Sequence, residues 1–245
     1  SVLKNADFIA ENLKEYGMEY VQIDGGWQVR AGQWEAEREL FPHGMKWLAD
    51  QIHKRGLKAA LWLSPFEIDE TSEVFKKHKD WLIRNRDGSL FVAGKAHSKA
   101  PSLRPDTPSG KRPKVYALDV TNPDARQWLY ELFKKITDDW GYDFVKIDWG
   151  YTTYCMAEVF QDKTKTKAQA YRLALQTIRD GIGPDRYFMN GGPHTQMGII
   201  DSARISMDSA ATWENISMSN GQARCIGRRY YMHQNLWAND PDMLM

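Results

Sequence analysis

The stretch Tyr142-Asp-Phe-Val-Lys-Ile-Asp148, followed by Trp149-Gly150, decides how this chain folds. It is a short, apolar-rich segment of strand type that comes directly after a helical pattern and ends in a carboxylate. In a parallel α/β fold the carboxyl ends of the strands meet on one face, and catalytic groups lie there. The stretch therefore predicts a strand that presents Asp148 on a functional face.

Strand and helix patterns alternate in both directions from this stretch. Strand-like segments occur six times, at about residues 19–24, 57–63, 142–148, 186–190, 202–207 and 235–238. Helical patterns lie between them, at about residues 44–55, 123–136, 167–181 and 222–233. Prolines, glycines and basic residues make residues 95–114 an irregular loop or insertion. The alternation predicts an α/β fold with a parallel sheet and helical crossovers.

A (β/α)8 barrel is the architecture that fits this alternation and the length of 245 residues. A closed barrel has eight strands, so we expect the first and the last to be missing and the remaining strands to form an open arc. The chain begins within the helical stripe of Ala6, Ile9 and Leu13 and ends abruptly at Met245. We expect residues 1–245 to be a single catalytic barrel domain of a longer protein that has flanking β-rich domains.

The charge balance limits the partners that this chain would bind. Lys and Arg number 33 and Asp and Glu 32, so the formal net charge is +1 and favours neither nucleic acid nor an anionic membrane. No apolar run approaches the length of a membrane span. A neutral ligand such as a saccharide fits this balance. The sequence leaves a homo-oligomer open and indicates no compartment.

No metal or cofactor is expected. The six histidines show neither His-x-His nor His-Glu-x-x-His spacing, which disfavours a metal-dependent barrel hydrolase. Gly-x-Gly-x-x-Gly, Walker and Gly-x-Ser-x-Gly motifs are absent from the sequence, so the usual patterns of dinucleotide, nucleotide and serine-hydrolase sites are missing. The two cysteines, Cys155 and Cys225, are too few to imply a disulfide framework or a structural zinc site.

Charged side chains follow several of the predicted strands. A single aspartate after a strand is more often a helix cap or a turn former than a functional group. A series of them at successive strand ends favours a site, because those ends converge on one face of a parallel barrel. The residues in such positions are Asp24, Lys146, Asp148, Arg204, Asp208, Asp240 and Asp242.

Two of these carboxylates have the placement that glycoside cleavage requires. A retaining glycosidase needs one carboxylate to attack the anomeric carbon and a second carboxyl to protonate the leaving oxygen. Asp148 is the predicted nucleophile, because Lys146 on the same face of the strand would keep it ionised. Asp208 is the predicted general acid, and Arg204 would orient it or hold substrate hydroxyls. The alternatives are a buried structural ion pair at Asp148 and a weak surface pair at Asp208.

Tryptophan is abundant, with ten in the chain, and five lie at or just past predicted strand ends. Apolar C–H faces of sugar rings stack on aromatic side chains, so this placement suits a saccharide pocket. Trp47, Trp81, Trp128 and Trp140 lie in or beside helices and are expected in the core. The five at strand ends are Trp27, Trp62, Trp149, Trp213 and Trp237.

Several blocks of sequence follow one another in a specific order. They are Val21-Gln-Ile-Asp24, Leu61-Trp-Leu-Ser-Pro-Phe66, Thr71-Ser-Glu-Val-Phe75, Tyr116-Ala-Leu-Asp-Val-Thr-Asn-Pro123, Phe144-Val-Lys-Ile-Asp148, Gly198-Ile-Ile-Asp-Ser-Ala-Arg-Ile-Ser-Met-Asp208 and Leu236-Trp-Ala-Asn-Asp-Pro-Asp242. Through these blocks the chain resembles, over nearly its whole length, the catalytic barrel of the melibiase-type α-galactosidases of microbes, a family of retaining glycoside hydrolases.

The resemblance implies roles for individual residues. Asp148 would form a covalent glycosyl-enzyme, and Asp208 would act as general acid and then as base, in agreement with the roles expected from the residues themselves. The resemblance further implies that the sugar contacts Asp24, Trp62, Lys146 and Arg204. Our predicted substrate-binding set also includes Trp27, Trp149, Asn190 and Trp213.

Two departures from the family pattern leave the sugar open. Gly25 stands where relatives commonly have a second aspartate, which binds the axial hydroxyl that marks galactose. Asn190-Gly-Gly192 stands where relatives have a cysteine between glycines. An α-N-acetylgalactosaminidase or a related exo-α-glycosidase is therefore the nearest rival, since a missing side chain at Gly25 would make room. A non-catalytic saccharide-binding barrel and a transglycosylase also stay open.

Overall fold

The computed structural model describes residues 1–95, 112–192, 196–206, 208 and 219–242. Its centre is a sheet of six parallel strands whose spatial order follows the sequence. They are β1 (Tyr20–Ile23), β4 (Lys58–Leu63), β8 (Phe144–Ile147), β9 (Tyr187–Asn190), β10 (Ser202–Arg204) and β11 (Ala238–Asp240). The α/β class is confirmed, and a strand lies at or beside each of the six predicted ranges, although β11 shares only Ala238 with the predicted range 235–238. Within the described residues the sheet does not close, because β1 and β11 are its two edges.

The register of the sheet brings the carboxyl ends of neighbouring strands to the same level. Trp62 of β4 is paired with Lys146 of β8, and Ile147 of β8 is paired with Asn190 of β9. Arg204 of β10 is paired with Asp240 of β11 in the same way. Residues that are far apart in the sequence therefore leave the sheet along one edge, as the parallel topology requires.

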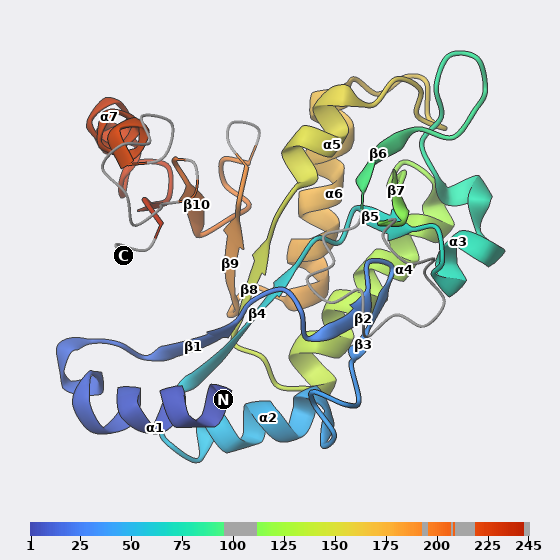
Figure 1. Ribbon diagram of the computed structural model, residues 1–245. Helices are drawn as coiled ribbons and strands as arrows, with labels where there is room; N and C mark the ends of the chain where they lie inside the picture. The colour runs from blue at the N-terminus through green and yellow to red at the C-terminus, as the bar shows by residue number, and fades with distance from the viewer. Residues whose placement is uncertain (96–111, 193–195, 207, 209–218, 243–245) are drawn as a thin grey trace.

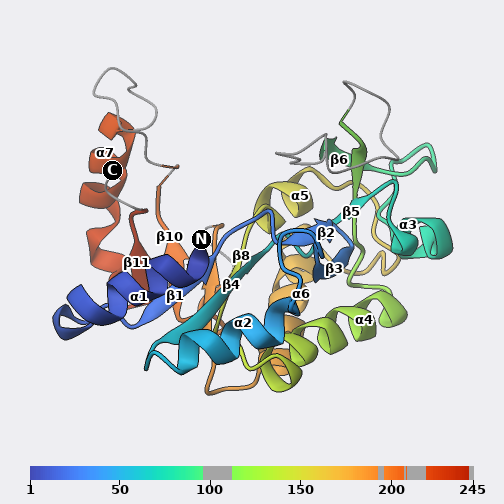
Figure 2. The same cartoon turned by 60° about the horizontal axis from the view of Figure 1, so that its bottom comes forward.

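Helices lie between most of the neighbouring strands and cover the sheet (Figure 1). In both views α1 (Val2–Asn12) lies beside α2 (Gly44–His53), and α4 (Pro123–Lys134) lies along α6 (Lys167–Ile182) (Figure 2). The start of α4 follows from the sequence, because Asn122 accepts hydrogen bonds from the backbone of Asp124 and Ala125 and proline occupies the first turn. The start of α6 is fixed by a capping box between Thr166 and Gln169.

Apolar stripes join these helices to the sheet. Helix α2 buries Met45, Leu48, Ala49 and Ile52, which lie on one side of the helix at the spacing that the sequence predicts. The strand β4 is buried along five of its six residues, as expected for a strand that is covered on both faces. The tight packing of this core is what holds the strand ends, and thus the functional side chains, in fixed positions.

Several short elements were not predicted from the sequence. A three-stranded antiparallel sheet consists of β5 (Glu67–Asp69), β7 (Lys114–Ala117) and β6 (Val92–Lys95), and the hairpin β2 (Gln28–Arg30)–β3 (Gln33–Ala36) follows β1. The pairing joins segments such as Glu67–Asp69 and Lys114–Ala117, which lie far apart in the sequence, and local periodicity does not indicate it. The remaining helices are α3 (Glu73–Lys77), α5 (Gly150–Met156) and α7 (Ser219–Arg229), with α7 and the small sheet on opposite sides of the molecule in both views (Figures 1 and 2).

Candidate active site

An ion pair joins the ends of β1 and β8. Lys146 Nζ lies 3.5 Å from Asp24 Oδ2, and the lysine side chain is 12% exposed whereas the aspartate is 62% exposed. Asp24 also accepts hydrogen bonds from Gln22 Nε2 and from the backbone of Gly25, at 3.0 and 2.8 Å. The carboxylate is thus oriented by its own strand and faces solvent, where it is available to a ligand hydroxyl.

The carboxylate of Asp148 lies between β4 and β9. Its Oδ2 accepts a hydrogen bond of 3.3 Å from Trp62 Nε1, and its Oδ1 accepts one of 2.9 Å from the backbone of Trp149. The side chain that reaches Asp148 is therefore the indole of Trp62, whereas the ammonium of Lys146 is paired with Asp24.

A glycine completes the surroundings of this carboxylate. A Cβ atom on Gly191 would lie 2.5 Å from Asp148 Oδ1, and the amide of Gly191 donates to the carbonyl of Ile147 at 2.8 Å. No side chain fits at this position without displacing the carboxylate. Asn190-Gly-Gly192, which departs from the family pattern, is thus the segment that lets β9 pass directly beside the predicted nucleophile.

The backbone turns sharply after Asp148. Trp149 adopts a left-handed conformation, with φ of 60°, and is the residue that precedes α5. Such a conformation is costly for a residue with a bulky side chain and is found where the surrounding structure requires it. It leaves the Trp149 indole 41% exposed at the end of β8, in the position predicted for a sugar contact.

Arg204 holds a second group of carboxylates at the ends of β10 and β11. Its side chain is 10% exposed and contacts Asp208 Oδ1, Asp240 Oδ2 and Asp242 Oδ1 at 2.9, 2.9 and 2.7 Å. Burial opposes the charge of Arg204, but hydrogen bonds and charges from Asp240, Asp242 and Asp208 together raise its pKa. Asp208 is 82% exposed, so the predicted general acid is open to solvent. Its partner, the Arg204 guanidinium, is held by Asp240 and Asp242.

Asp240 and Asp242 lie at a predicted strand end, but the sequence alone assigned them no role. Asp242 has φ of 75°, a left-handed conformation, and its amide donates to Asp240 Oδ1 at 2.9 Å. This turn directs both carboxylates at the same guanidinium. The spacing Asp-Pro-Asp is the only sequence signal for it, because proline fixes the backbone between them.

Glu67 is a titratable group near the site that the sequence did not indicate. It belongs to β5, and the residue is 6% exposed. Burial is the main cause that raises the pKa of Glu67 from 4.5 to about 7, a hydrogen bond with Ser64 opposes the rise, and the negative charge of Asp148 adds to it. A carboxyl with this pKa exchanges its proton near neutral pH, beside the predicted nucleophile.

The structure corrects two predicted sugar contacts, because both side chains are fully buried. Trp27 is 0% exposed, and its Nε1 donates to the carbonyl of Trp62 at 2.8 Å. Asn190 is also 0% exposed and donates to the hydroxyl of Tyr171 at 2.7 Å. They are core residues that support the site. Trp213, the last predicted sugar contact, lies outside the described residues.

The space expected beside Gly25 is filled. A Cβ atom at this position would lie 3.0 Å from Cζ3 and 3.2 Å from Cε3 of Trp62. The absence of a side chain at Gly25 therefore makes room for the indole of Trp62, which is itself only 7% exposed. The atoms nearest to this position thus belong to Trp62, and the expectation that Gly25 makes room for a larger sugar substituent stays a prediction.

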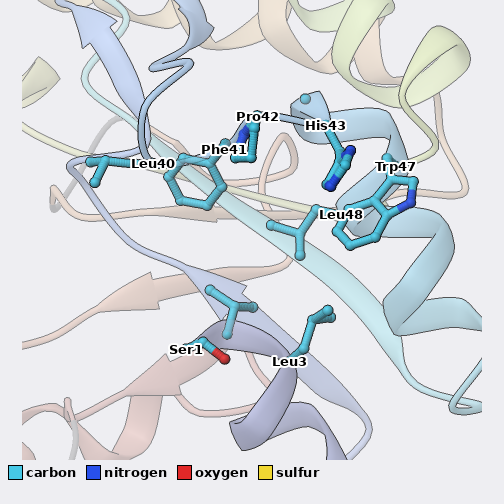
Figure 3. A pocket seen from close by; sticks show the side chains of 10 residues that line it. Ser1, Leu3, Leu40, Phe41, Pro42, His43, Trp47 and Leu48 are labelled. Atoms are coloured by element: carbon cyan, nitrogen blue, oxygen red, sulfur yellow. The ribbon is translucent and has the colours of Figure 1, made fainter.

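A cavity of about 180 Å³ lies elsewhere, between the start of α1 and the segment that leads into α2. Figure 3 shows Leu3, Phe41, Trp47 and Leu48 around it, with the ring of His43 beside Trp47. The rings of His43 and Trp47 are 4.5 Å apart. The lining contains no carboxylate, so this cavity has none of the groups that glycoside cleavage requires.

Within the described part of the chain, no group of three His, Cys, Asp or Glu side chains is arranged to hold a metal ion. Cys155 and Cys225 are both free thiols. Of the helices that the structure describes, none combines the length and the apolar character of a membrane span.

Comparison with known proteins gives this geometry a context. A family model described as Melibiase matches residues 4–185. Alpha-galactosidase Mel36A of Lactobacillus acidophilus is 28% identical over 241 residues, which cover 95% of this chain and 27% of that protein. A type blood alpha-D-galactosamine galactosaminidase of Flavonifractor plautii is 24% identical over 181 residues, covering 69% of this chain and 16% of that protein.

A solved structure extends the similarity to three dimensions. TtGalA, an alpha-galactosidase from Thermus thermophilus in complex with stachyose, superposes with a TM-score of 0.79 at 28% identity. The match covers 100% of this chain and 50% of that one. The chain thus spans half of this solved relative and less of the two curated relatives, whose remaining parts have no counterpart in it.

Proposed function

Because the chain belongs to the melibiase family, we propose that its protein is a retaining α-glycoside hydrolase that removes terminal α-galactosyl residues from oligosaccharides or glycoconjugates. The observation that carries the proposal is the cluster of Asp24, Lys146, Trp62 and Asp148 at the carboxyl ends of three adjacent strands. The family relatives named alpha-galactosidase, one of them solved with stachyose, support the same substrate class.

The reaction follows from two carboxylates with different surroundings. In the first step an oxygen of Asp148 forms a bond to the anomeric carbon while the glycosidic C–O bond breaks, and Asp208 gives its proton to the leaving oxygen. In the second step water attacks the anomeric carbon, Asp208 takes a proton from that water, and the bond to Asp148 breaks. The configuration at the anomeric carbon is retained because it is inverted twice.

The neighbouring side chains have supporting roles in this proposal. The N–H of Trp62 occupies one side of Oδ2 of Asp148 and fixes the direction in which the carboxylate points. Asp24 and Lys146 offer an acceptor and a donor to sugar hydroxyls, and Arg204 does the same near Asp208. Trp149 presents an exposed indole on which a sugar ring can stack.

The parallel sheet is proposed to be part of a (β/α)8 barrel. Six parallel strands in sequence order with helical crossovers support this architecture, and the open edges at β1 and β11 are where further strands would pair. Residues 1–245 are proposed to be a single catalytic domain within a longer protein that has β-rich flanking domains. The solved relative, twice as long as this chain, supports the greater length.

One rival function has support of its own. A related exo-α-glycosidase that acts on an amino sugar is supported by the 24% identity with the A type blood alpha-D-galactosamine galactosaminidase of Flavonifractor plautii, and an α-N-acetylgalactosaminidase stays the nearest rival of this kind. Other exo-α-glycosidases, a non-catalytic saccharide-binding barrel and a transglycosylase are outcomes of the same test.

The test uses the full-length protein and a panel of aryl α-glycosides that includes the galactoside and the N-acetylgalactosaminide. We expect release of the aryl group from the galactoside, with an α-configured sugar as the first product by NMR. Asp148→Asn should abolish turnover, whereas Asp50→Asn in α2, where the side chain is 46% exposed, should not. Turnover of another glycoside alone would overturn the proposed substrate, and full activity of Asp148→Asn would overturn the mechanism.

A further inference from the structure

Gly25 occupies a position that does not need glycine for its backbone. Its φ lies outside the left-handed region in which glycine is favoured, unlike Gly26, whose φ is 115°. A residue with a side chain would therefore adopt the same backbone without strain. What glycine provides here is space, because the atoms nearest to a Cβ at position 25 are Cζ3, Cε3 and Cη2 of Trp62, at 3.0, 3.2 and 3.4 Å.

Trp62 cannot easily yield this space. Its backbone lies within β4 and is paired with Lys146 of β8, and its carbonyl accepts the 2.8 Å hydrogen bond from Trp27 Nε1. Trp27 is in turn held in the core, with Trp140 packed edge-on against its ring at 6.0 Å. The backbone of Trp62 is thus held by the sheet, so the indole can make room for a Cβ at position 25 only by turning about its own side-chain bonds.

A tilt of this indole reaches the nucleophile directly. The ring edge opposite to Gly25 carries Nε1, which donates to Asp148 Oδ2 at 3.3 Å. This distance is already near the upper limit of a hydrogen bond, so a displacement of a few tenths of an ångström breaks it. On its other side the Asp148 carboxylate lies directly against Gly191, because a Cβ there would lie 2.5 Å from Oδ1.

We propose that Gly25 is a positioning residue for Asp148 and acts through Trp62. The missing side chain lets the indole lie close to Gly25, and the indole in turn holds the carboxylate in the direction of attack. The proposal rests on the proposed function, in which Asp148 is the nucleophile. Glycine at position 25, where relatives commonly have an aspartate, therefore serves the attack by Asp148 in the first step and does not make room for a larger sugar.

A double-mutant cycle tests this coupling. Gly25→Ala should lower kcat by about tenfold with little change in KM, since misplacing a catalytic group by 1 Å can cost about a hundredfold. In a Trp62→Phe background, where the N–H donor is already absent, the same change at Gly25 should cost less than about twofold. Gly94→Ala is the matched control, because its Cβ would meet Val115 at an ordinary 3.7 Å in β6; it should have no effect in either background.

A crystal structure of Gly25→Ala gives a readout that does not depend on turnover. We expect the Trp62 indole to be displaced and the distance from Nε1 to Asp148 Oδ2 to exceed 3.5 Å. Equal losses of kcat in both backgrounds, or an unchanged distance of 3.3 Å, would overturn the proposal. If the wild-type protein hydrolyses no α-glycoside, the proposed function fails, and the structure of the variant still decides whether Gly25 positions Asp148 through Trp62.

Discussion

Glu67 should make the protein less stable as the pH rises through neutrality. Burial is the main reason that the pKa of Glu67 is about 7 in the folded protein, against an ordinary value of 4.5. Between these two values the folded state keeps the proton that the unfolded chain has released, so the folded state binds more protons. Stability from this group is therefore fully present below about pH 4.5 and is lost as the pH rises to about 7.

The size of the effect follows from the same two values. At 1.36 kcal/mol for each pH unit, a pKa of about 7 in place of 4.5 corresponds to about 3 kcal/mol. The residue is only 6% exposed, so solvent does not screen most of this cost. Glu67→Gln removes the charge at nearly constant volume. The variant should therefore be more stable than the wild type by about 3 kcal/mol at pH 8 and nearly equal to it at pH 4.5.

Urea unfolding at several pH values between 4.5 and 8 measures this difference. The free energy of unfolding of the wild type should fall relative to that of Glu67→Gln across this interval, with most of the fall complete by pH 7. Glu35→Gln, an exposed glutamate of β3, serves as the control and should run parallel to the wild type. Parallel curves for wild type and Glu67→Gln would refute the reasoning, because Glu67 would then titrate alike in the folded and unfolded states.

Three further substitutions test other parts of the structure. Gly191→Ala should reduce kcat/KM at least about a hundredfold with an intact fold by circular dichroism, because its Cβ would lie 2.5 Å from Asp148 Oδ1 and would displace the carboxylate. Arg204→Met should lower the free energy of unfolding by about 3 kcal/mol in urea, because it removes the cation that pairs with the partly buried carboxylates of Asp240 and Asp242. Thr166→Ala should lower it by about 1 kcal/mol, because the capping box with Gln169 is lost, while Thr166→Ser should not.

The strands and the general position of the site could be predicted because they depend on local patterns. β4 is apolar along most of its length, and Asp24, Lys146 and Arg204 follow or end strands whose direction is fixed by the helical crossovers. A parallel sheet then brings these residues to one edge without further information. The short antiparallel sheet that contains Glu67 has no such pattern, and its pairing depends on residues far apart in the sequence.

The two tryptophans Trp27 and Trp62 show where sequence reasoning stops. Both follow or end a predicted strand, and both are equally suited to stack on a sugar. The hairpin β2–β3, which begins directly after Trp27, returns the chain towards the core, and the indole of Trp27 is buried against Trp34 and Trp140. Which indole reaches Asp148 is therefore decided by tertiary packing, and that packing is not visible in the spacing of the residues.

Two glycines influence the position of the predicted nucleophile as well as the groups that donate hydrogen bonds to it. Asp148 accepts hydrogen bonds from Trp62 and from the backbone of Trp149, yet the position of its carboxylate depends on Gly191 on one side and, through Trp62, on Gly25 on the other. Neither glycine has a chemically active side chain that would indicate this role. If Gly25 alone changed the sugar, Gly25→Ala would alter the preference among glycosides; if it positions Asp148, the same variant should slow every glycoside that the enzyme accepts by a similar factor.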